Sequence, residues 1–251
     1  MSITDSFDMN SKEIINPAEV IPKIEGFPET VIASFSKKSL DILASFCELQ
    51  EISHIIATGL TIPIYKFEYK GKTLGIYHTL LGGPASGGLL EEVIAKGAKK
   101  VLFFGSCGSL DKSITSGHLI VPTAAYRDEG TSYHYAPPSD YIEVKTADKL
   151  SEILSEIGAP HCKSKIWTTD AFYRETMNNI EARKRDGCCG VDMECASVMA
   201  VGDFRNIEVY QFVYAADCLD GDKWDERILS ETPDDLREAI LHVALESAIR
   251  L

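Results

Sequence analysis

Short apolar runs alternate with segments of helical periodicity along most of the chain. Residues 30–35, 101–104 and 209–215 have the length and the apolar composition of strands that are buried on both faces. A helical pattern follows the first of these runs, behind Ser36 as a possible N-terminal cap. Because strands and helices alternate, we predict a single α/β domain. Its mixed, mainly parallel central sheet is expected to be flanked by helices in a three-layer sandwich.

Glycine, proline and capping residues mark where further elements begin and end. These signals add strands at residues 62–69, 73–79, 119–122 and 165–168, and helices at residues 147–157 and from the glycine-rich loop 81–88 to residue 96. In the last helix, Thr232 is the expected cap and Pro233 the first helical residue, ahead of an apolar face that includes Ile240. Since no flexible linker divides the chain, we predict an N-terminal extension at 1–29 and one domain at 30–251.

The composition narrows the classes of partner. The chain of 251 residues has 38 acidic and 25 basic side chains and a formal net charge of −13, which argues against a nucleic-acid binder because phosphate contacts need clustered cations. The N-terminus lacks the basic and apolar stretches of a leader, and no apolar run reaches about 18 residues, so we expect no membrane partner. Seven cysteines are scattered without metal-ligand spacing, which indicates free thiols in the cytoplasm, no metal and no organic cofactor.

The segment 190–217 carries the strongest chemical signal. Its pattern predicts a strand, an acidic turn, a helix and a second strand that ends in an aspartate. Glu194 lies where the first strand meets the helix, and Asp217 lies at the end of the second strand. The carboxyl ends of parallel strands meet at one edge of a sheet, where α/β proteins bind ligands. We therefore expect the two carboxylates in one binding site.

Two further loops have the composition of ligand-binding segments. In the loop FGSCGS, Gly105 and Gly108 allow backbone amides to approach a ligand, and Ser106 adds a hydroxyl, which suits an anion or a sugar hydroxyl. Tight turns alone would explain these glycines equally well. In the segment WTTDAFYRET, Phe172 is the expected stacking face for a flat heterocycle, and packing of the aromatic rings under a loop is the alternative.

Taken in chain order, several motifs resemble those of one enzyme family. They are GGPAS, GSCGSL, RDEGTSYHYAP, TTDAFY, VDMECAS and AAD. With these motifs the chain resembles the nucleoside phosphorylase and nucleosidase superfamily, of the purine nucleoside phosphorylase and uridine phosphorylase type, from residue 30 to the final helix. The resemblance implies cleavage of the N-glycosidic bond of a nucleoside, with the nucleoside and phosphate as partners. It also implies a homo-oligomer, either a dimer or a hexamer.

The resemblance implies a sugar site and a catalytic acid. Glu194 would hold the ribose hydroxyls, with Met193 against the face of the sugar. Asp192 stands where the family usually has a glutamate and would be a shorter ribose contact. Asp217 would protonate or hydrogen-bond the imidazole-ring nitrogen of a leaving purine, for which burial must raise its pKa. Glu194 and Asp217 are therefore the expected catalytic residues.

The resemblance also implies a base site and an acceptor site. Phe172 would stack on the base, next to Tyr173. Gly105 and Ser106 would contact the phosphate or a nucleophilic water, with phosphate as a co-substrate and no cofactor. Lys38 would supply positive charge at the same place, as a point charge rather than a bidentate group.

Two departures from the family pattern bear on the reaction. The arginines that bind phosphate in the family have no counterpart in the early loop, since Arg127 is the first arginine of the chain, and Lys37 and Lys38 cannot reproduce a bidentate contact. The Gln and Arg that contact uracil in uridine phosphorylases are replaced by Thr176 and Asn178. Purine nucleosides are therefore favoured as substrates, with uridine as the alternative.

Three functions remain open at this level. The first is phosphorolysis, which gives the free base and ribose 1-phosphate. The second is hydrolysis of the same bond by water, because the loss of the cationic clamp removes the main preference for phosphate. The third is a catalytically silent nucleoside-binding or storage protein on the same fold.

Overall fold

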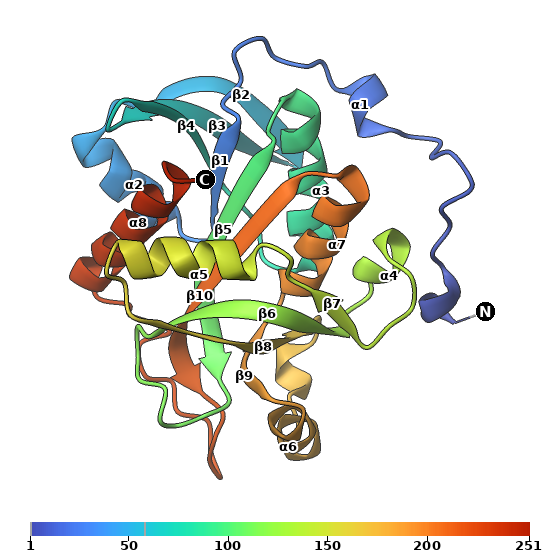
Figure 1. Cartoon of the computed structure of the whole chain (residues 1–251), viewed down its shortest axis with the longest axis vertical. Helices are drawn as coiled ribbons and strands as arrows, with labels where there is room; N and C mark the ends of the chain where they lie inside the picture. The colour runs from blue at the N-terminus through green and yellow to red at the C-terminus, as the bar shows by residue number, and fades with distance from the viewer. Residues whose placement is uncertain (1, 58) are drawn as a thin grey trace.

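One ten-stranded sheet runs through the computed structural model, which describes residues 2–57 and 59–251 (Figure 1). The strands are β1 Thr30–Ser34, β2 Gln50–Ala57, β3 Leu60–Tyr69, β4 Lys72–His78, β5 Lys100–Ser109, β6 Leu119–Asp128, β7 Tyr141–Glu143, β8 His161–Thr169, β9 Cys188–Asp192 and β10 Glu208–Cys218. The helices are α1 Pro17–Val20, α2 Lys37–Phe46, α3 Gly83–Lys96, α4 Ser132–Tyr135, α5 Ala147–Glu156, α6 Met177–Arg185, α7 Cys195–Arg205 and α8 Asp234–Ala248, with 3-10 turns η1 Ile3–Asp5 and η2 Phe172–Arg174.

Helices cover the central strands on both faces. α2, α5 and α8 lie together on one side, where α8 contacts β1 and β5 (Figure 1). α3 and α7 pair on the other side, where α7 contacts β10 and β6 (Figure 1). This arrangement confirms the α/β class and the mixed sheet between helices that the sequence predicts. No helix among the described residues combines the length and the apolar composition needed to cross a lipid bilayer.

The centre of the hydrophobic core is formed by β1, β5 and β10. Their apolar runs have partners on both faces, as strands between two helical layers require. Val31, Leu102 and Phe103 are completely buried, and the rings of Phe104 and Phe212 stack across β5 and β10 with centroids 5.8 Å apart. The three apolar runs that the sequence predicts to be buried strands are therefore the strands at the centre of the core.

The strand pairings close part of the sheet into a ring. Parallel pairs join β4, β1, β5 and β10 in one block and β6, β8 and β9 in another. Antiparallel pairs between β10 and β6 and between β5 and β9 connect the two blocks. The pairings therefore return from β5 through β10, β6, β8 and β9 to β5, and a partly closed barrel stands at the C-terminal end of β5. The hairpin of β3 and β4 extends the sheet on the far side.

The register within this ring brings the two acidic strand ends together. Gly108 on β5 pairs with Asp217 on β10 and with Val191 on β9. A side chain at Gly108 would collide with its neighbours, because an added Cβ would lie 2.5 Å from Leu219 Cδ1 and 2.9 Å from Val191 Cγ1. Glycine is thus needed here so that β9 and β10 can end on either side of β5.

The glycine-rich segment 81–88 is helical over most of its length, which differs from the expected loop. α3 begins at Gly83, after Gly82 with a φ of 93° at the N-cap. An added Cβ at Gly83 would lie 2.2 Å from Ser197 Oγ on α7, so glycine is required for the close packing of the two helices. The segment therefore serves helix packing, and only its first residues form a turn.

The start of the last helix also differs by one residue from the expectation. Pro233 occupies the N-cap, and the Thr232 hydroxyl donates to the carbonyl oxygen of Ile228 instead of capping the helix. The acidic pair at the start of α8 lies in its first turn, as the helix dipole favours. Ser36 is the N-cap residue of α2, but its side chain makes no capping hydrogen bond.

Residues 2–29 run along the outside of the domain (Figure 1). Glu13 accepts a hydrogen bond from Arg205 on α7, with an Nη1 to Oε1 distance of 2.9 Å, and the amide of Ile24 donates to the carbonyl of Lys96. Ile14 and Ile15 are exposed by 99% and 73%, which leaves apolar surface on this segment. The division into an extension at 1–29 and a domain at 30–251 stays a prediction.

Candidate active site

A cavity of about 620 Å³ opens where β5, β9 and β10 end. It collects most of the candidate residues, which come from four separate segments of the chain: Ser106, Phe172, Tyr173, Asp192, Met193, Glu194 and Asp217. Gly105 and Lys38 line a second, adjoining cavity instead. Glu194 and Asp217 therefore share one cavity, as expected from their positions at strand ends.

Glu194 is a buried carboxyl group with one fixed partner. It stands at the N-cap of α7, directly after β9, and its side-chain Oε1 accepts the amide hydrogen of Gly82 at 2.6 Å. Burial, and then the charge of Asp192, raise the pKa of Glu194. Because a carboxylate has about four acceptor positions, capacity remains for hydroxyl donors of a ligand in the cavity.

Asp192 is held by protein donors on both oxygens. Oδ1 accepts from the Thr168 hydroxyl at 2.7 Å, and Oδ2 accepts from the amide of Cys195 at 2.9 Å and from the Gln211 side chain at 3.0 Å. Burial raises the pKa of Asp192, and these hydrogen bonds oppose the rise. Asp192 thus ties together β8, β10 and the start of α7, and it positions the Met193–Glu194 turn. The ribose contact that the resemblance implies for it stays a prediction.

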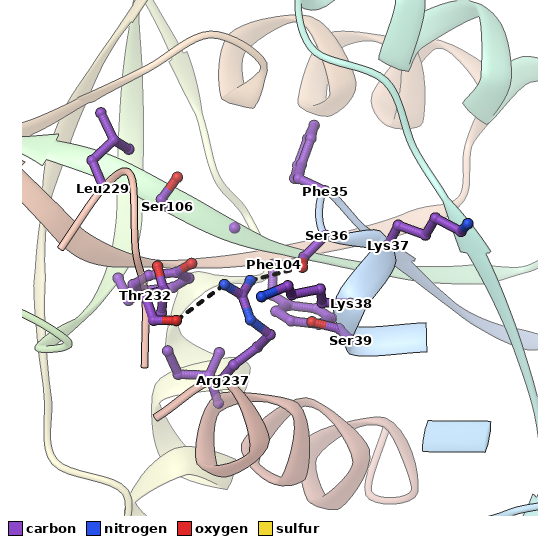
Figure 2. A pocket seen from close by; sticks show the side chains of 13 residues that line it. Phe35, Ser36, Lys37, Lys38, Ser39, Phe104, Ser106, Leu229, Thr232 and Arg237 are labelled. Carbon is purple, nitrogen blue, oxygen red and sulfur yellow. Dashed lines mark hydrogen bonds between the residues drawn. The ribbon is translucent and has the colours of Figure 1, made fainter. Parts of the chain in front are cut away.

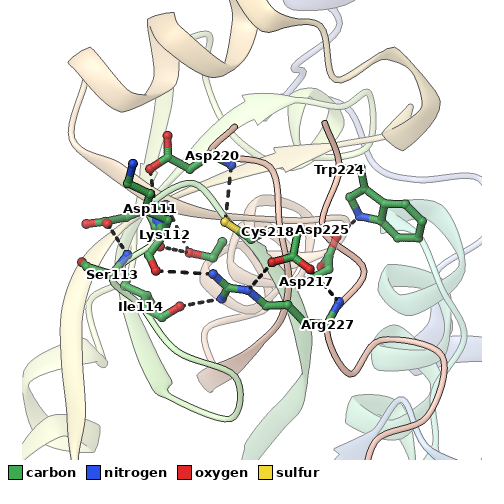
Figure 3. A network of polar contacts seen from close by, with 11 residues as sticks. Asp111, Lys112, Ser113, Ile114, Asp217, Cys218, Asp220, Trp224, Asp225 and Arg227 are labelled. Atoms are coloured by element: carbon green, nitrogen blue, oxygen red, sulfur yellow. Dashed lines mark hydrogen bonds and ion pairs between the residues drawn. The ribbon is translucent and has the colours of Figure 1, made fainter. Parts of the chain in front are cut away.

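Asp217 is paired with a tryptophan that the sequence did not single out. Its Oδ2 accepts a hydrogen bond from Trp224 Nε1 at 2.7 Å (Figure 3). Burial raises the pKa of Asp217, and the Trp224 hydrogen bond partly opposes that rise. Trp224 also lines the cavity while it remains 57% exposed. The Asp217 carboxyl, which is expected to act as an acid, is therefore hydrogen-bonded to an indole that lines the same cavity.

The loop that carries Trp224 is fastened at its base. Cys218 and Asp225 exchange two backbone hydrogen bonds, of 2.8 and 3.0 Å. Arg227, with a φ of 46°, donates from Nη1 to the carbonyl of Ile114 at 2.6 Å (Figure 3). These contacts hold the backbone of the loop at the end of β10, and the loop in turn places the Trp224 indole beside Asp217.

Removing the indole N–H should move the pH profile of catalysis. In Trp224→Phe the Asp217 carboxylate loses a donor that stabilises its charged form, so its pKa should rise. Activity that needs protonated Asp217 falls as pH rises through that pKa, so the fall should shift to higher pH. A kcat/KM profile measures this, and a substrate whose leaving group needs no proton serves as the internal control. A limb that stays in place, or moves to lower pH, would contradict the assignment.

The aromatic end of the cavity is open. Phe172 and Tyr173 are 45% and 88% exposed, and their ring centroids are 4.0 Å apart on η2. Glu175 follows them and was also missed from the sequence, where it looks like an ordinary surface acid. Burial first, and then the charge of Asp217, raise the pKa of Glu175 to about 7. Polar and aromatic groups thus meet here, as they do in sites for heterocycles.

The adjoining cavity, of about 360 Å³, is lined by three cations, by hydroxyl groups and by apolar side chains that include Phe35 and Phe104 (Figure 2). Lys37 and Lys38 come from the first turn of α2, and Arg237 comes from α8. Ser106 lines both cavities, so the two spaces meet at the C-terminal half of β5. Arg237 is the third residue that the sequence did not suggest, because nothing in the pattern of α8 shows which face meets α2.

The part of the chain that forms the two cavities matches one protein family. Residues 29–246 match the model of the Phosphorylase superfamily. The chain belongs to the phosphorylase superfamily. This membership confirms the resemblance that the ordered motifs suggest, and the match covers all the strands and the greater part of the helices that form the two cavities.

Relatives within the phosphorylase superfamily are distant. A guanosine phosphorylase of Halorubrum lacusprofundi is 29% identical over 168 residues, which are 64% of this chain and 67% of that protein. A purine nucleoside phosphorylase of the DeoD type from Aliivibrio fischeri is 25% identical over 194 residues, which are 74% of this chain and 80% of that protein.

Solved structures show the same fold. The purine nucleoside phosphorylase of Toxoplasma gondii, in complex with immucillin-H, superposes with a TM-score of 0.76 at 21% identity and covers 92% of this chain and 96% of its own. The uridine phosphorylase of Vibrio fischeri superposes with a TM-score of 0.72 at 20% identity, and the superposition covers 93% of this chain and 95% of that protein. At this identity the likeness establishes the fold alone.

Proposed function

We propose that this member of the phosphorylase superfamily cleaves the N-glycosidic bond of a nucleoside with inorganic phosphate as acceptor. One observation carries the proposal: two buried carboxyl groups from separate strand ends, Glu194 and Asp217, line one cavity beside a cationic one. The names of relatives, a guanosine phosphorylase and purine nucleoside phosphorylases, support the same reaction. The products would be the free base and ribose 1-phosphate, without a metal or organic cofactor.

The proposed roles follow from the charges that develop in the reaction. The bond between C1′ and the base nitrogen breaks, its electron pair leaves with the base, and an oxygen of phosphate bonds to C1′. Asp217, in its protonated form, would donate to the base, where negative charge grows. Glu194 would accept hydrogen bonds from the ribose hydroxyls and hold the sugar against Met193. Ser106 lines both cavities and is placed to contact the acceptor.

We propose a purine nucleoside as the preferred substrate. An imidazole-ring nitrogen can receive the proton of Asp217, whereas uracil offers no such nitrogen. Phe172 and Tyr173 would stack on the base at the open end of the cavity, and Glu175 adds a further acceptor there. The positions where uridine phosphorylases contact uracil hold Thr176 and Asn178, which favours purines over uridine.

Release of base from inosine, guanosine, adenosine and uridine, with and without phosphate, tests the proposal. In a phosphate-free buffer the wild-type protein should be nearly inactive, and added phosphate should restore turnover and yield ribose 1-phosphate. A rate indifferent to phosphate, with free ribose as product, would contradict phosphorolysis and establish hydrolysis instead. No release from any nucleoside would favour the silent binding protein.

We also propose that the protein is a homo-oligomer. The exposed Ile14 and Ile15 at the surface supply apolar area of the kind that subunit contacts bury. Light scattering after size exclusion should give a mass that is a multiple of the 27.6 kDa chain. Charged substitutions at the two isoleucines should lower that mass, and a wild-type mass of one chain would contradict the proposal.

A further inference from the structure

The cationic cavity contains one guanidinium that is only partly satisfied by the protein. Arg237 Nη1 donates to Ser36 Oγ at 2.8 Å, and Nη2 donates to the carbonyl of Thr232 at 3.2 Å (Figure 2). Its Nε is buried and has no hydrogen-bond partner in residues 2–57 and 59–251. The side chain is 15% exposed, so water has limited access to this donor. A buried donor without a partner costs free energy, which an incoming acceptor would recover.

The surroundings of Arg237 carry more positive than negative charge. Lys37 and Lys38 line the same cavity. The nearest carboxylate is Asp234, whose Oδ1 lies 3.8 Å from Lys38 Nζ and 3.9 Å from Arg237 Nε, and its side chain is 79% exposed. The exposed Asp234 carboxylate is thus shared by Lys38 and Arg237, and Lys37 lies in the same cavity. The cavity is locally cationic although the formal net charge of the chain is −13. An anion in the cavity would balance this local excess.

The start of α2 adds backbone donors to the cavity. The first amides of a helix have no partner within the helix, and a side-chain cap normally satisfies one of them. The Ser36 side chain makes no such bond, because its hydroxyl accepts from Arg237. The Ser39 amide donates to the Ser36 carbonyl at 3.1 Å, so among the described residues the amides of Lys37 and Lys38 are the first-turn donors left for a ligand, next to the guanidinium that is bonded to the Ser36 hydroxyl.

We propose that Arg237 binds the phosphate acceptor and determines that phosphate, rather than water, attacks the sugar. The inference rests on the proposed function. It adds that Arg237 takes the place of the phosphate-binding arginine that the early loop lacks. The guanidinium offers its unpaired Nε–H to a phosphate oxygen, Lys38 and the α2 amides neutralise the remaining charge, and Ser106 faces both the anion and the nucleoside cavity. α8, rather than the loop after β1, provides the cationic anchor.

Calorimetry with inorganic phosphate tests this assignment directly. In a chloride buffer the wild-type protein should bind phosphate, and Arg237→Gln should weaken binding by about ten- to a hundredfold. Arg237→Lys should weaken it less, because lysine keeps the charge but not the planar set of donors. Arg250→Gln is the matched control, since it removes an arginine beyond the end of α8 that contacts Glu246 instead, and it should bind as the wild type does. Thermal unfolding of each variant reports whether it is folded.

The kinetic arm separates the acceptor from the nucleoside. Arg237→Gln should raise the KM for phosphate and leave the KM for nucleoside little changed. If Arg237→Gln binds phosphate as tightly as the wild type does, the inference is overturned, even if cleavage persists. If Arg237→Gln does not fold, wild-type phosphate affinity in Arg237→Lys overturns it. If the wild type binds phosphate through Arg237 yet cleaves no nucleoside, the proposed function fails and the anion site stands. Cleavage of a nucleoside 5′-monophosphate without added phosphate, lost in Arg237→Gln, would assign the cavity to the phosphoester of the substrate and overturn the acceptor role.

Discussion

Glu194→Gln is expected to lower kcat/KM for nucleosides by about a hundredfold or more. Two ribose hydroxyls would lose their hydrogen bonds to this carboxyl group, which are worth about 0.5–1.5 kcal/mol each when it is neutral and about 1.5–3 kcal/mol each when it is charged. The amide keeps an oxygen for the Gly82 N–H, so the turn between β9 and α7 should stay in place. Glu194→Ala should be worse, because it also leaves that N–H without its partner.

Steady-state kinetics with the preferred nucleoside measures the effect. Glu181→Gln, an exposed position on α6, is the matched control and should behave as the wild type. Wild-type kcat/KM in Glu194→Gln would show that the sugar is held elsewhere. A variant that loses affinity for nucleoside while the wild type shows no turnover would instead support the binding protein.

The strand runs and the two acids could be predicted because burial and chemistry leave a mark in the sequence. β1, β5 and β10 are apolar along their length, and an acid at the end of such a strand has few structural explanations. The sequence does not predict α6 and β2, because elements that bury few side chains leave no clear pattern of apolar positions. α6 buries only Ile180 among its nine residues, and β2 is largely exposed, so neither shows a clear period.

The closure of the ring was beyond the sequence pattern. Nothing local indicates that β5 pairs with both β9 and β10, although this register is what brings Val191 and Asp217 to either side of Gly108. The sequence predicts a loop at 81–88 because helix packing and loop formation both favour small residues. The contact with Ser197 that decides between them is a tertiary one.

Trp224 and Arg237 were missed because their roles depend on contacts between segments. Trp224 lies in a polar loop, where an isolated tryptophan was the one available signal, and its partner Asp217 is seven residues earlier. Arg237 lies 201 residues from Ser36, and only the packing of α8 beside α2 brings them together. The absence of an early arginine was correctly observed, but the supply of a guanidinium from the last helix could not be inferred from spacing.

Asp217→Asn is expected to lower kcat for purine nucleosides by about a hundredfold or more, the usual size of a general-acid contribution. Asparagine can still accept the Trp224 hydrogen bond through its oxygen, so the loop of residues 219–231 should keep its position. The loss should be much smaller for a 4-nitrophenyl riboside, because nitrophenolate leaves without protonation. A merely structural role of Asp217 would lower both rates alike, so the ratio of the two rates is the measurement.

The pH dependence gives an independent check of the same assignment. Burial raises the pKa of Asp217, so the protonated form persists to higher pH than for an exposed aspartate. Wild-type activity on purine nucleosides should therefore decline as pH rises through that pKa, and the decline should be absent in Asp217→Asn, which does not titrate. Glu175 titrates nearby, with a pKa of about 7, so Glu175→Gln must retain the decline if Asp217 is its source. A decline that disappears in Glu175→Gln and persists in Asp217→Asn would transfer the role of acid to Glu175.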